Sequence, residues 1–159
     1  IILYTDSIDE PCSTGSRYIH YSTINNDYTY YLGPDLSYSI KSTDLNNDNL
    51  EEIIIESCNT NCNGCNGFLL ILSVQNNSLK ELFNIEYFNK LITDNNWKTF
   101  TVIDDVWVVG EESRYDPHKY SFSTYSFNKN NYQKIKEEIT VKKYENVPGI
   151  NVERISIQE

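Results

Sequence analysis

Residues 44–55 read Asp-Leu-Asn-Asn-Asp-Asn-Leu-Glu-Glu-Ile-Ile-Ile, a polar stretch that becomes apolar at Ile53. Asn and Asp favour turns because their side chains hydrogen-bond to nearby backbone groups. Three consecutive β-branched isoleucines favour a strand instead. We therefore predict a loop that leads directly into a buried strand over residues 52–57.

The same alternation between Asn-rich connections and strand-like segments recurs along the chain, roughly every 8–12 residues. Residues 68–74 form a continuous apolar run, which predicts a central strand buried on both faces. No segment of a dozen residues shows the 3.6-residue period of a helix. The other predicted strands cover residues 17–21, 28–32, 36–42, 79–85, 98–103, 106–111, 119–127, 132–144 and 152–157.

These elements predict an all-β fold with little helix, in which about ten antiparallel strands form a sandwich, a barrel or a propeller-like meander. We expect one domain over residues 1–159, with residues 145–159 as a candidate tail. Residues 84–91 fit either a strand or a short helix. Asp104 and Asp105 are expected to form a hairpin turn between two strands.

The composition limits the classes of partner. The chain has 23 acidic and 13 basic residues and a formal net charge of −10. Nucleic acids and anionic membranes repel a surface of this sign, so neither is an expected partner. No apolar run of 18 residues is present, so we predict no membrane insertion. A cation or another protein is the partner that this charge favours.

The polar loop carries oxygen atoms at alternate positions. Asp44, Asn46 and Asp48 stand at positions 1, 3 and 5, the Leu50 carbonyl at position 7, and Glu52 at position 9. Calcium binds six to eight oxygen ligands at about 2.3–2.6 Å, from carboxylates, amides and carbonyls. The alternative is a solvated turn rich in Asn and Asp. The order of the oxygens, followed at once by a strand, favours a Ca²⁺ site.

This loop differs from an EF-hand, because Asn49 replaces the glycine of position 6 and Ile55 replaces the glutamate of position 12. Asn49 can adopt the left-handed conformation that a sharp turn requires, at some cost. Residues 44–56 instead resemble the calcium loop of FG-GAP/VCBS-type (integrin-like) repeats, in a single copy. The resemblance implies a calcium loop that joins two strands, without implying a complete propeller.

Four cysteines are present, and an even number permits two disulfides. Cys58, Cys62 and Cys65 lie in one loop of turn-forming residues, and Cys12 lies far away in the sequence. We predict disulfide bonds among them, with the pairing left open. A zinc site with four thiolates is the alternative. The C-x₃-C-x₂-C spacing also resembles an iron–sulfur cluster motif, but this chain lacks the alternating strand–helix pattern of the barrel that carries that motif.

Evidence for catalysis is weak. His20 and His118 are the only histidines. His20 is expected on the side of a strand and His118 in a loop, and we interpret both as ordinary surface histidines. The acidic pairs 104–105 and 111–112 could supply two glycosidase-like carboxyls, but adjacent acids arise by chance in so acidic a chain. We therefore predict a protein that is not an enzyme.

Together, a calcium loop and disulfides favour an oxidising compartment where calcium is abundant. The sequence predicts an extracellular or periplasmic calcium-binding β domain with a role in recognition or structure. The alternatives are a periplasmic inhibitor or immunity protein that blocks a partner enzyme, and a small hydrolase that uses His118.

Overall fold

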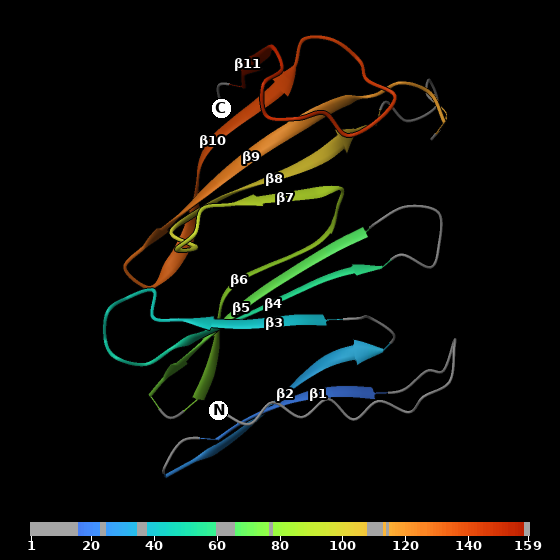
Figure 1. Cartoon of the computed structure of the whole chain (residues 1–159). Helices are drawn as coiled ribbons and strands as arrows, with labels where there is room; N and C mark the ends of the chain where they lie inside the picture. Colours follow the sequence, from blue (N-terminus) through green and yellow to red (C-terminus); the bar gives the residue numbers. More distant parts are fainter. Residues whose placement is uncertain are drawn as a thin grey trace.

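The computed structural model describes residues 16–22, 25–34, 38–59, 66–76, 78–107, 113 and 115–157. Within these ranges the chain forms strands and no helix, which confirms the all-β prediction. Within each sheet, strands that follow one another in the sequence pair in antiparallel fashion, so each sheet is a meander. The described strands form three open sheets, stacked one above the other in Figure 1.

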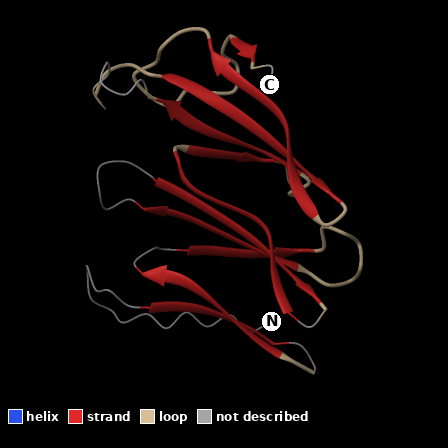
Figure 2. Cartoon of the chain, turned by 180° about the vertical axis from the view of Figure 1, so that it is seen from behind, coloured by secondary structure: helices blue, strands red, loops and turns tan. Residues whose placement is uncertain are grey.

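The first sheet pairs β1 (Ser16–Ser22) with β2 (Asp27–Pro34). The second, central sheet contains β3 (Tyr38–Thr43), β4 (Glu52–Asn59), β5 (Asn66–Gln75) and β6 (Ser78–Phe88). The third sheet contains β7 (Lys90–Thr93), β8 (Thr99–Val106), β9 (Lys119–Asn128), β10 (Asn131–Thr140) and β11 (Arg154–Ser156). Figure 2 shows the same stack from behind.

The central sheet is buried on both faces, as its apolar runs predict. Successive residues of a strand point to opposite faces, so Ile55 and Leu70 pack towards the first sheet while Ile54 and Leu69 pack towards the third. All four side chains are at most 1% exposed. The two interfaces are therefore separate hydrophobic cores on either side of one sheet.

The outer face of the third sheet is covered by the chain's own C-terminal segment. Tyr144, Val147 and Val152 pack against a buried cluster of Ile103, Tyr120 and Phe122. The segment then returns as β11, which pairs with the end of β10. Residues 144–157 thus pack against the third sheet.

Two sequence predictions need correction, and one alternative that the sequence left open is settled. Asp104 and Asp105 do not form a turn: β8 continues through them, and they pair with Ser121 and Tyr120 of β9. The last long strand ends at Thr140 rather than at residue 144. Residues 84–91, left open between strand and helix, are strand: β6 runs to Phe88 and β7 follows after one residue. In each case pairing with a distant strand, which local sequence does not encode, decides the boundary.

Candidate functional site

The loop over residues 44–51 joins β3 and β4, which pair directly with each other. Its backbone wraps around the Asp44 carboxylate. Asp44 Oδ1 accepts hydrogen bonds from the amides of Asn47 and Asp48 at 2.7 and 3.2 Å, and Oδ2 accepts one from the Asn49 amide at 3.1 Å. Asn47 and Asn49 have φ angles of 61° and 67°, in the left-handed region that Asn tolerates better than most residues. The Asn at position 6 thus replaces the usual glycine.

Glu52 lies beneath this loop as the first residue of β4, and its side chain is fully buried. Its carboxylate accepts hydrogen bonds from the Leu45 amide at 2.7 Å and from the Ser73 hydroxyl at 3.0 Å. Burial raises the pKa of Glu52. The two hydrogen bonds lower that pKa, and the negative charges of Asp48 and Asp44 raise it further. A cation close to these carboxylates would reverse the unfavourable charge.

The Asn46 amide joins two of the predicted ligands. Its Nδ2 donates to Asp48 Oδ2 at 2.9 Å and to Glu52 Oε1 at 3.2 Å. The two carboxylates therefore converge on one point, at which the amide N–H groups supply partial positive charge. Asn46 Oδ1 accepts a hydrogen bond from the Asp48 amide at 2.9 Å.

Leu50, the carbonyl donor expected at position 7, lies in the exposed part of the loop. Its own amide donates to Asp48 Oδ1 at 2.7 Å. In the part of the chain that the structure describes, no three His, Cys, Asp or Glu side chains form a ready group for a metal ion. A calcium shell here would draw on the Asn46 amide and on backbone carbonyls as well, and it stays a prediction.

The loop is anchored to the third sheet. The Leu45 side chain is fully buried in the core between the central and third sheets. Its carbonyl accepts a hydrogen bond from the Lys98 ammonium, which lies 5.6 Å from the centre of the Phe127 ring. The carbonyl of Trp97, the residue before Lys98, accepts a 2.6 Å hydrogen bond from the Tyr132 hydroxyl. The loop of one sheet and the 94–98 turn of the next therefore form one contact region.

The predicted cysteine and histidine sites have different outcomes. Cys12, Cys62 and Cys65 lie outside the described residues, as does the side chain of Cys58, so disulfides and zinc stay predictions. His118 is only 4% exposed, which corrects the expectation of a surface histidine, and its ring lies 4.5 Å from that of Trp107.

The acidic pair in β8 is electrostatically unusual. Burial raises the pKa of Asp104 to about 7, with further contributions from a hydrogen bond to Asp105 and from its charge. Asp105 also accepts a 2.8 Å hydrogen bond from the Asn89 amide. The sequence predicted a hairpin turn for this pair, and its place inside β8 could not be predicted because it depends on pairing with β9. The acidic residues 111–112, its suggested partners, lie outside the described residues.

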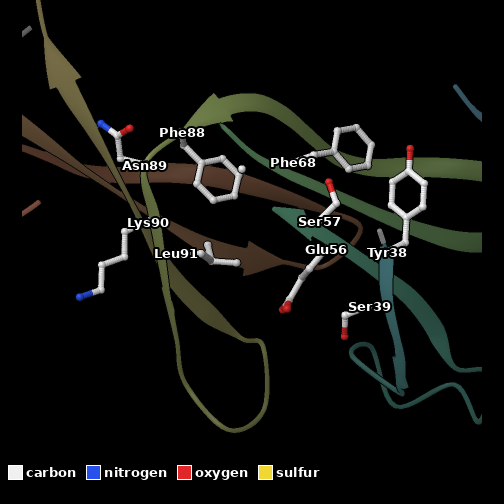
Figure 3. Close-up of a pocket in the computed structure, with 10 residues that line it drawn as sticks. Tyr38, Ser39, Glu56, Ser57, Phe68, Phe88, Asn89, Lys90 and Leu91 are labelled. Carbon is white, nitrogen blue, oxygen red and sulfur yellow. The ribbon is translucent and has the colours of Figure 1, made fainter. Parts of the chain in front are cut away.

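A groove of about 570 Å³ lies at the end of the central sheet where Tyr38 of β3 pairs with Ser57 of β4, opposite to the end that carries the 44–51 loop. Figure 3 shows the residues that line it. Phe88 packs so tightly over Gly67 that a Cβ atom there would lie 2.2 Å from the ring. The lining residues come from the ends of β3, β4 and β5 and from the connection between β6 and β7: Tyr38, Ser39, Glu56, Ser57, Gly67, Phe68, Phe88, Asn89, Lys90 and Leu91.

An internal repeat, overlooked in the sequence, relates the central and third sheets. Thr-Asp-x-Asn occurs at residues 43–46 and again, 50 residues later, at 93–96, each time between the first two strands of a sheet. In the second loop Asp94 again accepts backbone amides, from Asn96 at 3.2 Å and Thr99 at 3.1 Å. However, Thr43 pairs with Glu52 in the central sheet, whereas Thr93 pairs with Phe100 in the third sheet, so the second loop has no acid at this position. Lys98 is the last residue of the second loop. Only the first loop has the full set of acidic ligand positions.

The described residues include no apolar helix of membrane-spanning length. Searches against family models, curated proteins and solved structures find no match for this chain.

Proposed function

We propose that this protein is a calcium-binding β domain with a role in recognition or structure rather than catalysis, in an extracellular or periplasmic setting. The observation that carries the proposal is the convergence of the Asp48 and Glu52 carboxylates on the Asn46 amide group. A divalent cation satisfies two converging carboxylates better than an amide does, because it carries a full charge.

The donor set suits calcium. It consists of hard oxygen atoms, from Asp44, Asp48 and Glu52 with the Asn46 amide and the Leu50 carbonyl. When calcium binds, Asn46 would turn its Oδ1 towards the ion, since the nitrogen cannot act as a ligand. The ion would also offset the repulsion that raises the pKa of Glu52. Calcium would thereby stabilise the hairpin of β3 and β4 and, through Leu45, its contact with the third sheet. We also propose that the loop is of the FG-GAP/VCBS type, that the domain binds another protein, and that its cysteines form disulfides.

The test is thermal unfolding of the whole chain with calcium and with EDTA, together with calorimetric titration of calcium. Free calcium at 100 times its dissociation constant adds about 2.7 kcal/mol to the free energy of unfolding. At this chain length that corresponds to a rise in Tm of roughly 5–10 °C. The rise should disappear in Asp44→Asn/Asp48→Asn.

Asp94→Asn is the matched control, because Asp94 has the same place in the repeat without the other acidic ligands. It should keep the full calcium response. A wild-type Tm that calcium leaves unchanged, or an undiminished response in Asp44→Asn/Asp48→Asn, would refute the proposal.

A further inference from the structure

The calcium loop has a positive charge fixed beside it by the next sheet. The Lys98 ammonium donates a hydrogen bond to the carbonyl of Leu45, which stands between the predicted ligands Asp44 and Asn46. Lys98 lies two residues after the second copy of the Thr-Asp-x-Asn repeat, directly before β8 in the sheet that packs against the loop. Lys98 therefore has two effects on the loop, one through its hydrogen bond and one through its charge.

Only the charge acts in opposite directions on the free and the calcium-bound loop. The hydrogen bond holds the Leu45 peptide in place whether or not an ion is bound. The hydrogen bond places the ammonium on the loop backbone, one residue from the predicted ligands Asp44 and Asn46. At that position its positive charge would favour the acidic calcium-free loop and would oppose the binding of a divalent cation. Ser73 and Leu45, which bind the Glu52 carboxylate directly, carry no such charge.

We propose that Lys98 is a positioning residue that sets the calcium affinity of the neighbouring loop: it supports the calcium-free loop and weakens the binding of the ion. This inference rests on the proposed calcium function. It assigns to the degenerate second loop a role in regulating the first.

The experiment measures the dissociation constant of calcium for the whole chain by calorimetric titration at low and at high salt. Two neutral replacements are used, Lys98→Gln and Lys98→Met, because Met is unbranched and apolar and suits a side chain that ends beside the Phe127 ring. Lys98→Arg keeps the charge. Lys41→Gln is the matched control, since Lys41 lies over the Trp97 ring beside the same turn but forms an ion pair with Glu56 at 3.3 Å.

We expect calcium to bind about five-fold more tightly to the neutral variants at low salt, equivalent to about 1 kcal/mol. The difference should shrink in about 1 M salt, where the screening length is roughly 3 Å. The Tm of the calcium-free neutral variants should fall at the same time. Lys98→Arg and Lys41→Gln should bind calcium like the wild type.

A purely structural anchor would lower both stability and affinity when removed. Neutral variants that bind calcium as weakly as the wild type, or more weakly, would therefore overturn the role of Lys98 while leaving the calcium function intact. Absence of calcium binding to the wild type, or wild-type binding by Asp44→Asn/Asp48→Asn, would instead refute the proposed function on which the inference rests.

Discussion

Replacing Asp104 with Asn should stabilise the protein at alkaline pH and remove a pH dependence that the wild type shows. Burial and the adjoining Asp105 raise the pKa of Asp104 to about 7, from an ordinary value of 3.8. The folded chain therefore holds a proton at mildly acidic pH that the unfolded chain has already released. The resulting stability is fully present below about pH 3.8 and is lost as the pH rises through about 7.

The magnitude follows from the interval that an experiment can cover. Asp104 is protonated in the folded chain only below its raised pKa, which covers roughly 1.5 pH units of an experiment that runs from about pH 8 to about pH 5.5. Over each of these units the free energy of unfolding increases by about 1.4 kcal/mol. This gives a ceiling of ~2 kcal/mol. Since the carboxyl keeps partial contact with solvent, we expect between about 1 and 2 kcal/mol. Asn resembles the protonated acid and has no charge to lose, so its contribution does not vary with pH.

Urea unfolding of wild type and Asp104→Asn at the two pH values measures this difference. The wild type should gain about 1–2 kcal/mol more than the variant on going from about pH 8 to about pH 5.5. Asp27→Asn, at an exposed position in β2, controls for the loss of one negative charge elsewhere. Equal pH dependence in wild type and Asp104→Asn would refute the assignment of a raised pKa to this pair.

Two further substitutions test the packing beside the groove and beside the 94–98 turn, which contacts the 44–51 loop. Gly67→Ala should lower the free energy of unfolding by about 1–3 kcal/mol, measured by chemical denaturation, because the new Cβ atom would lie 2.2 Å from the Phe88 ring. Gly149→Ala is the control. No atom lies within 4 Å of its Cβ position, so the free energy of unfolding should change by less than about 0.5 kcal/mol. Tyr132→Phe should cost about 1–3 kcal/mol, since it leaves the Trp97 carbonyl without its 2.6 Å hydrogen bond, and a loss below about 0.5 kcal/mol would contradict this account.

Much of the secondary structure could be predicted because it depends on local pattern. The apolar run 68–74 is a central strand, and the alternating residues of β3 are a half-buried edge strand. The Asn-rich stretch 44–51 is a loop between paired strands. The hairpin of β9 and β10 turns at Lys129 and Asn130, where it was expected. These outcomes follow from the two-residue period of strands and the turn preference of Asn and Asp.

The candidate site was predicted only in part. The sequence predicted five ligand positions in the loop, and they stay a prediction. It did not predict the contacts of Lys98, Leu45 and Ser73, which come from the 94–98 turn, from the loop itself and from β5. The 50-residue repeat was the available signal for the role of the 93–98 stretch. The repeat indicates that a second, degenerate loop exists. It does not indicate that Lys98 of this second loop donates a hydrogen bond to Leu45 of the first.

The sequence by itself determined the all-β class, most of the strands and the polar character of the 44–52 loop, because each depends on neighbouring residues. Only the tertiary structure decided the sheet arrangement, the full burial of Glu52 and the burial of His118, and the place of Asp104 inside a strand. These properties depend on what packs against a residue from a distant part of the chain. The same acidic or imidazole side chain can be exposed in a turn or buried between sheets, and local pattern does not distinguish the two.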